Sequence, residues 1–130
     1  MIDLPVTSLA AIANGLLLLL LTYRVILFRR RGGVVMGDND DRALAKAIRG
    51  QANAAEQIPI ALILMGLAEM QGGNALALTV LALLLTLGRL MHGVYFAIHG
   101  TPWRLRFYGM LATLAAQAGL LLVLLVTVLT

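Results

Sequence analysis

The sequence contains no cysteine, which excludes a disulfide framework, a thiolate metal site and a cysteine nucleophile. Charged residues are also scarce: they make up 12% of the 130 residues, whereas soluble domains contain about 25%. Hydrophobic residues account for 61%, and the mean hydropathy is +0.93. These values exclude a water-soluble globule, and they also exclude a disordered chain, because such a chain needs charge to stay solvated. Any thiol chemistry must therefore come from a ligand.

Four long apolar stretches dominate the chain, at residues 6–28, 52–70, 76–98 and 107–130. A helix needs about 20 such residues to cross a hydrocarbon core about 30 Å thick. Lipid cannot satisfy a bare backbone, and the stretches lack the two-residue alternation of a membrane barrel. We therefore predict an all-α integral membrane protein, a four-transmembrane-helix bundle forming a single domain over residues 1–130. We do not expect the first stretch to be a cleavable signal peptide, because the preceding Met-Ile-Asp-Leu-Pro has no basic residue and the apolar run is too long.

The connections between these stretches differ sharply in charge. We expect a polar loop at residues 29–48, a tight turn at 71–74, and a break at 100–102, where glycine and proline interrupt the chain. Every basic residue except Arg89 lies in or beside the first and third connections. The positive-inside rule then predicts that both of these connections are cytoplasmic and both termini outside, as in a multi-pass protein of a bacterial inner membrane. The run Arg29-Arg30-Arg31 is interpreted as a topogenic and lipid-headgroup signal, not as a nucleic-acid site.

A polar stripe enters the membrane at the start of the second span. Its members are spaced four, three, four and three residues apart, which places them on one face of a helix. They are Arg42, Lys46, Arg49, Asn53 and Glu56, and Gln51 and Gln57 flank them. Glu56 would lie about 10 Å deeper than Arg49. An ionisable group at that depth costs a few kcal/mol unless it is paired or solvated, so the stripe is a candidate functional site.

The third span carries a matching polar face. Arg89 lies at about the depth of Glu56, and the two could form a structural ion pair, which would not exclude contact with a ligand. Arg89, His92 and Phe96 share this face, with Tyr95 nearby. We expect no metal site, because the histidines have no third or fourth convergent donor.

Together these groups fit an anionic, peptide-like cofactor beside a greasy co-substrate. Arginines bind carboxylates in a bidentate manner, Glu56 could accept an ammonium group, and Asn53 and Gln51 could hold amides. Arg106 begins the fourth span, where the helix dipole adds positive potential.

The segment from Arg49 to Pro59 resembles the family of membrane-associated proteins in eicosanoid and glutathione metabolism (MAPEG), in particular its bacterial members similar to microsomal glutathione transferase. The resemblance rests on Arg49, Gln51, Asn53, Glu56 and Pro59 at their intervals. It extends to the basic end of the first span, to Arg89 followed by His92, and to an arginine just before the fourth span. The resemblance implies a homotrimer that binds glutathione between neighbouring subunits, near the cytosolic face.

Carried over by position, the resemblance implies a role for each site residue. Arg49, Gln51, Asn53 and Glu56 would hold the glutathione peptide, Arg29 or Arg30 would reach it from the first span, and His92 would lie beside it. Arg106 would stabilise the thiolate, with Arg104 as the second choice. Glutathione would be the co-substrate, conjugated to a hydrophobic electrophile or used to reduce a lipid hydroperoxide.

Two departures from the family pattern leave an alternative open. Gln57 stands where the family often has tyrosine, and Phe96 stands where a second tyrosine is found. Tyr95 supplies a nearby phenol for the ligand, although it lies about 100° around the helix from Phe96. The alternative function is a noncatalytic scaffold of the same fold that binds lipids or another protein. A small cation exporter would also have four spans, but it needs an acidic residue in the first span, which has none.

Assembly is suggested by small residues along the fourth span. Gly109, Ala112, Ala116 and Gly119 lie close to one side, and Ala112 and Ala116 form a small-xxx-small arrangement. Such a stripe permits close helix approach, although ordinary alanine and glycine content would produce it as well. The number of subunits comes from the family resemblance alone.

Overall fold

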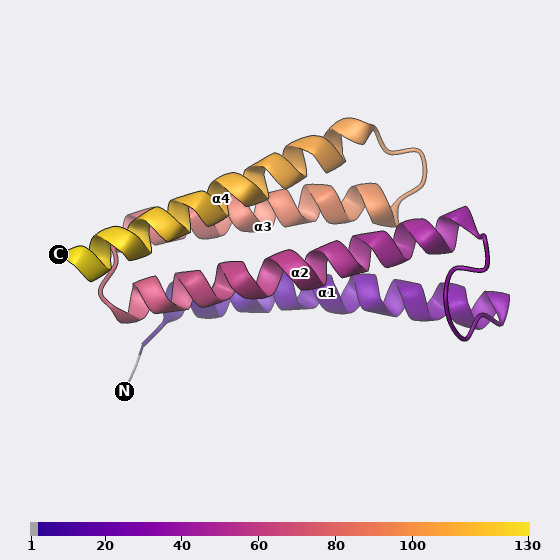
Figure 1. Cartoon of the computed structure of the whole chain (residues 1–130), viewed down its shortest axis with the longest axis horizontal. Coiled ribbons are helices and arrows are strands. Elements are labelled where there is room, and N and C mark those ends of the chain that lie inside the picture. The colour runs from indigo at the N-terminus through magenta and orange to yellow at the C-terminus, as the bar shows by residue number, and fades with distance from the viewer. Residues whose placement is uncertain (1–2) are drawn as a thin grey trace.

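The computed structural model describes residues 3–130, so the first two residues of the predicted domain lie outside the described part. Four helices run antiparallel: α1 (Pro5–Gly32), α2 (Arg42–Met70), α3 (Ala75–Ala97) and α4 (Trp103–Leu129), as Figure 1 shows. Both chain ends lie at one end of the bundle, and the connections α1–α2 and α3–α4 lie at the other. The predicted all-helical membrane architecture is confirmed.

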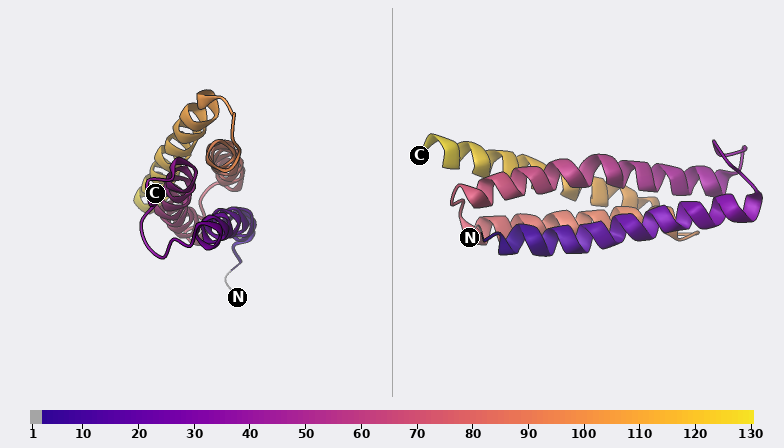
Figure 2. Two further views of the ribbon diagram at one scale, coloured as in Figure 1. Left: turned by 90° about the vertical axis from the view of Figure 1, so that its right-hand side faces the viewer. Right: turned by 90° about the horizontal axis from the view of Figure 1, so that it is seen from below.

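The packing is that of a square in which α1 and α4 occupy opposite corners. α1 contacts α2 and α3, and α4 contacts the same two helices. The end-on view in Figure 2 shows this arrangement around a common axis. Towards the end with the two connections, α4 diverges from α2 (Figure 1). This divergence determines where the functional site lies.

The helices extend further at the polar end than the apolar stretches predict. The expected loop at residues 29–48 is reduced to 33–41, because α1 continues to Gly32 and α2 already begins at Arg42. Asp41 caps α2, since its Oδ1 accepts hydrogen bonds from the amides of Ala43 at 2.8 Å and Leu44 at 3.3 Å. The predicted loop bounds were wrong because a helix continues into water wherever a cap and its own propensity sustain it.

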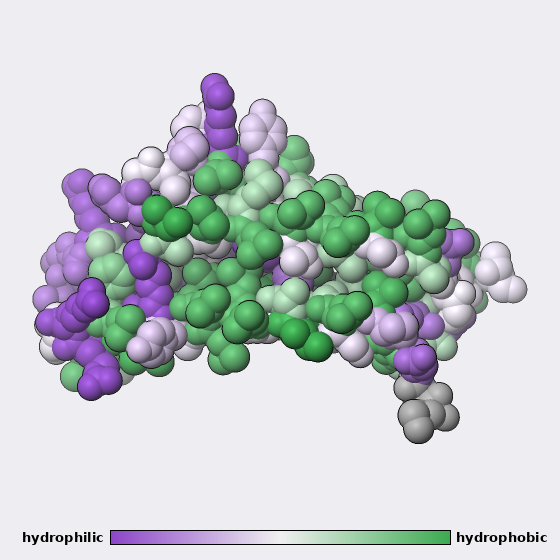
Figure 3. Space-filling model, turned by 180° about the vertical axis from the view of Figure 1, so that it is seen from behind, coloured by the Kyte–Doolittle hydropathy of each residue, from purple (hydrophilic) through white to green (hydrophobic). Residues whose placement is uncertain are grey.

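Three of the four helices, α1, α3 and α4, are long and apolar enough to cross a membrane. α2 falls short of that criterion because its first half carries the polar stripe. It nevertheless packs within the same bundle, because it contacts each of the other three helices. On the face drawn in Figure 3, hydrophobic side chains cover the middle, and hydrophilic ones gather mainly at the end with the two longer connections.

Two glycines bring the backbones of α3 and α4 into direct contact. A Cβ added to Gly88 would lie 2.8 Å from the carbonyl oxygen of Gly109. A Cβ added to Gly109 would lie 2.7 Å from both the Gly88 oxygen and the His92 nitrogen. Only glycine permits this approach, and it brings the His92 region of α3 against the first turns of α4.

At the opposite end, a carboxylate of α2 caps α1. Glu69 Oε1 accepts the amide of Val6 at 3.0 Å, and Oε2 accepts the amide of Thr7 at 2.8 Å. The residue at the N-cap position of α1, Leu4, makes no side-chain cap hydrogen bond. Glu69 therefore satisfies amides that would otherwise be exposed at the start of a membrane helix.

Candidate functional site

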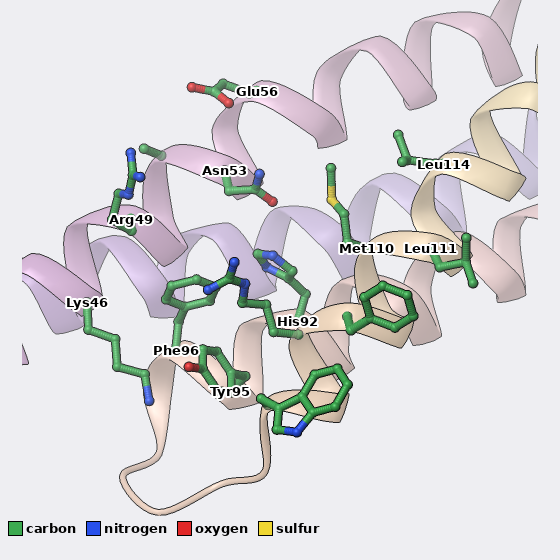
Figure 4. A pocket seen from close by; sticks show the side chains of 14 residues that line it. Lys46, Arg49, Asn53, Glu56, His92, Tyr95, Phe96, Met110, Leu111 and Leu114 are labelled. Carbon is green, nitrogen blue, oxygen red and sulfur yellow. The ribbon is translucent and has the colours of Figure 1, made fainter.

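A cavity of about 890 Å³ opens between α2, α3 and α4, at the end where α4 diverges (Figure 4). Its volume lies within the range of small-molecule sites, roughly 300–1,000 Å³. Six polar residues other than Glu56 line it: Lys46, Arg49, Asn53, His92, Tyr95 and Arg106. The cavity therefore gathers most of the residues that the sequence predicted for the site.

The stripe on α2 forms one wall, as its helical spacing predicts. Lys46, Arg49, Asn53 and Glu56 all line the cavity. Glu56 and Arg49 are exposed, whereas Asn53 and Lys46 are half-buried. Gln51 is turned away from the cavity, because its Nε2 donates to Thr22 Oγ1 on α1 at 3.5 Å.

α3 supplies a buried histidine and two aromatic rings. His92 is 5% exposed, and its ring lies 4.9 Å from that of Phe96. Tyr95 packs edge-on against Phe96 at 5.0 Å, and the Lys46 ammonium lies 4.2 Å from the centre of the Tyr95 ring. Phe96 packs directly on α2 at Gly50, where an added Cβ would lie 2.5 Å from the Phe96 Cβ. Although adjacent in sequence, Tyr95 and Phe96 both line the cavity, so this wall retains a phenol.

The two arginines near the start of α4 point to different sides of the helix. Both arginines are exposed, but Arg106 lines the cavity and Arg104 does not. The two positions differ by about 200° around the helix, so only one can face α2 and α3. The geometry thus favours the first choice, Arg106, over the second.

The outer wall of the cavity is an apolar face of α4 that sequence reasoning missed. Trp103, Phe107, Met110, Leu111 and Leu114 lie on one side of this helix and all line the cavity. Trp103 and Phe107 are 63% and 53% exposed. Their spacing of three or four residues could have revealed this face, but in a span that is apolar all round such a pattern does not stand out.

Arg89 is buried behind this cavity, and its environment corrects the expected pairing with Glu56. The side chain is 1% exposed. Its Nε donates to Thr113 Oγ1 at 2.9 Å and its Nη1 to Asn53 Oδ1 at 2.8 Å, while Nη2 lies 3.7 Å from Met110 Sδ. Among the residues that the structure describes, Glu56 is not a partner of this guanidinium. Equal depth was not sufficient, because the Glu56 side chain points away from His92 although it lines the same cavity (Figure 4).

The arginines expected from α1 do not reach the cavity of their own chain. No residue of α1 is among those that line it. Arg29 and Arg30 belong to the last turn of α1, and Arg29 Nη1 donates to the carbonyl of Val35 at 3.4 Å. Gln51 faces the same helix. None of these three residues lines the cavity.

Metal ligands do not converge in the part of the chain that the structure describes. Within residues 3–130, no three histidine, aspartate or glutamate side chains lie close enough together to hold an ion. The chemistry available in the cavity is therefore that of guanidinium groups, an ammonium group, an amide, an imidazole, a phenol and one carboxylate.

Comparison with known proteins places these features in a family. A model of the MAPEG family matches residues 7–126. The inner membrane protein YecN of Escherichia coli strain K12 is 38% identical over 111 residues, which cover 85% of this chain and 83% of the relative. The protein of the same name from Escherichia coli O6:H1 matches with the same identity and coverage. The region that the family model matches contains α2, α3 and most of α1 and α4, and it includes every residue that lines the cavity.

Proposed function

The chain belongs to the MAPEG family of multi-pass membrane proteins, and from that premise we propose that it is a membrane-bound glutathione transferase. In this proposal glutathione is the co-substrate, and the acceptor is a hydrophobic electrophile. A lipid hydroperoxide is a second acceptor class, since attack of the thiolate on a peroxide oxygen would give peroxidase activity.

One observation carries the proposal: cationic and polar groups from three helices line the same cavity as an apolar wall. Arg49 and Lys46 offer cations for the two carboxylates of glutathione, and Glu56 offers a carboxylate for its ammonium group. Phe107, Leu111 and other apolar residues of α4 border the same space. Glutathione and a hydrophobic acceptor would thus bind next to each other in one cavity.

The role of Arg106 in this proposal is electrostatic. A free thiol has a pKa near 8.5, so only a few per cent of it is ionised at pH 7. Lowering that pKa by two units requires about 2.7 kcal/mol of preferential thiolate stabilisation. A guanidinium at the start of a helix, beside a partly apolar cavity, supplies an interaction of this size.

The arginines of α1 fit the proposal if the protein is a homotrimer. Arg29, Arg30 and Gln51 do not line the cavity of their own chain. In the homotrimer that we propose, they would complete the cavity of a neighbouring subunit. In this arrangement the site lies on the cytoplasmic side of a bacterial inner membrane, with both termini outside. The concentration of basic residues at the cavity end supports that orientation.

Glutathione binding by the purified full-length protein tests the proposal. Ligand at ten times its dissociation constant stabilises a protein by about 1.4 kcal/mol, which raises the unfolding temperature measurably. We expect this stabilisation in the unmodified protein and its loss in Glu56→Ala. Asp3→Ala is the matched control, because it removes a carboxylate at the opposite end of the bundle.

The outcome also separates the transferase from the alternative scaffold. Stabilisation by glutathione together with conjugation of a hydrophobic electrophile supports the enzyme. If millimolar glutathione leaves the unfolding temperature unchanged, the transferase is rejected, and a noncatalytic scaffold that binds lipids or another protein takes its place.

A further inference from the structure

The guanidinium of Arg89 joins the three helices that enclose the cavity. The residue belongs to α3, its Nη1 donates to Asn53 on α2, and its Nε donates to Thr113 on α4. At 1% exposure, Arg89 is enclosed by protein, whereas Asn53 is half-buried and lines the cavity. Arg89 therefore lies behind the cavity wall, and Asn53 lies between it and the open space.

The chemistry of these two groups fixes the orientation of the Asn53 amide. A guanidinium has five N–H donors and no acceptor. The group that meets Arg89 Nη1 must therefore be the amide oxygen, which lies 2.8 Å away. The NH2 group of the same amide occupies the other arm of the planar group, and it makes no hydrogen bond to another residue in the described part of the chain. Figure 4 shows the Asn53 side chain projecting from α2 on the side where Met110 and His92 lie.

The Arg89 guanidinium is itself held by a directional chain of hydrogen bonds. Thr113 has one hydroxyl proton, which it donates to the carbonyl of Gly109 at 2.8 Å. Its oxygen is thereby left to accept from Arg89 Nε at 2.9 Å. The chain of hydrogen bonds from Arg89 through Thr113 to Gly109 has one direction only, because the guanidinium can only donate and the carbonyl oxygen of Gly109 can only accept.

We propose that Arg89 is a positioning residue that fixes the Asn53 amide with its NH2 group towards the cavity, so that Asn53 recognises an oxygen acceptor of the bound ligand. The ligand group opposite Asn53 is then a carboxylate or carbonyl oxygen, and not an amide N–H or an ammonium group. This inference rests on the proposed function, because glutathione is the ligand it addresses. It also divides the polar wall: Lys46, Arg49, Asn53 and Arg106 donate, and Glu56 accepts.

Asn53→Asp tests the orientation directly. The substitution keeps an oxygen against Arg89 and supplies a counter-charge to it, but it replaces the cavity-facing NH2 with a second oxygen. We expect glutathione affinity to fall roughly 10- to 100-fold, because a donor to a charged or carbonyl oxygen is lost. The unfolding temperature without ligand should stay equal or rise, because Arg89 gains an ionic partner.

Gln57→Glu is the matched control for this change. It converts an amide to an acid one turn further along α2, outside the cavity lining. There the Gln57 Oε1 only accepts, from Gln117 Nε2 at 3.0 Å, and an acid can still accept. Glutathione affinity should change by less than about 3-fold, since no donor towards the ligand is lost.

Two substitutions of Arg89 separate orientation from general packing. Lysine also donates without accepting, so Arg89→Lys should keep affinity within about 3-fold, whereas Arg89→Met frees the amide to turn and should lower affinity roughly 10-fold. Calorimetric titration with glutathione measures all five proteins, and unfolding in the absence of ligand shows which variants fold.

The possible results are distinguishable. If the unmodified protein does not bind glutathione, the proposed function fails. If it binds, and Asn53→Asp binds equally well or better in a folded protein, the assigned orientation is wrong. If affinity in the whole series follows only the unfolding temperature, Arg89 acts on stability and not through Asn53.

Discussion

Gly88 and Gly109 meet backbone to backbone where α3 crosses α4, with room for no side chain between them. The contact lies one helical turn from His92 on α3 and from Arg106 on α4. Those two residues line the same cavity, so the distance between their helices determines the shape of the site. The glycines are therefore part of the functional architecture, although neither contacts the cavity.

Gly109→Ala should destabilise the protein and distort the site. The new methyl group would lie 2.7 Å from two backbone atoms of α3. These atoms cannot move aside unless the whole helix shifts. Overpacking of this kind costs about 1–3 kcal/mol. Thermal unfolding in detergent measures the loss, and Gly15→Ala is the control, because nothing lies within 4 Å of its added Cβ. A control that is destabilised as much as Gly109→Ala would refute the steric explanation.

Glu69→Gln should loosen the start of α1. The carboxylate accepts two backbone amides, those of Val6 and Thr7, whereas a carboxamide offers one oxygen and no charge to the helix N-terminus. The loss of about 1 kcal/mol would speed local amide exchange roughly 5-fold. Hydrogen exchange resolved by residue would show this at Val6 and Thr7, while amides in the middle of α4 should stay unchanged. If Val6 and Thr7 exchange at the same rate in Glu69→Gln as in the unmodified protein, the capping role is contradicted.

The sequence predicted the features that depend on period and length. Four helices follow from the apolar stretches, and the placing of Arg49, Asn53 and Glu56 on one wall follows from their spacing. These predictions depend only on the length and the residue spacing of each helix taken alone. Features that depend on how helices are rotated against each other were harder to predict.

Arg89 illustrates the difficulty. Its depth matched that of Glu56, but depth along a helix says nothing about direction around it, and the nearer oxygen on α2 belongs to Asn53. Glu69 was missed for a related reason, since a carboxylate near the end of a span resembles any interfacial charge until the start of α1 is known to lie beside it. The choice between Arg104 and Arg106 likewise needed the rotation of α4 about its axis.

Tyr95→Phe should weaken glutathione binding without affecting stability. Its ring is already held by Phe96 and by the Lys46 ammonium, and phenylalanine preserves both contacts. The substitution removes only the phenolic hydroxyl, whose loss costs about 1 kcal/mol, or roughly 5-fold in affinity, if it bonds the ligand. Calorimetry would measure the affinity and thermal unfolding the stability. An unchanged affinity would show that the phenol does not contact glutathione.

Leu111→Gln should raise the KM for the hydrophobic acceptor and leave glutathione binding intact. Leu111 belongs to the apolar wall, away from the cationic groups, and its replacement adds a polar amide where an apolar acceptor would pack. Loss of apolar contact of this size costs about 1–2 kcal/mol, or roughly 5- to 30-fold in KM. A series of electrophiles with increasing chain length would test it, because the penalty should grow with the length of the chain. A penalty independent of chain length would place the acceptor elsewhere.

Arg106→Ala should raise the pKa of the glutathione thiol in the complex. The cation favours the thiolate over the thiol, so without it ionisation requires a higher pH, and at neutral pH the rate of conjugation falls with the thiolate fraction. Ultraviolet absorbance of the thiolate, followed as a function of pH with glutathione saturating, measures this directly. The control is Arg104→Ala, which removes the same charge from the same helix end but outside the cavity lining. Screening by water should make its effect on the titration small.

If both variants shift the titration equally, the general positive potential of the cytoplasmic end, and not one positioned guanidinium, stabilises the thiolate. If Arg104→Ala alone shifts it, the two arginines exchange roles and the rotation of α4 about its axis must differ in the assembled protein.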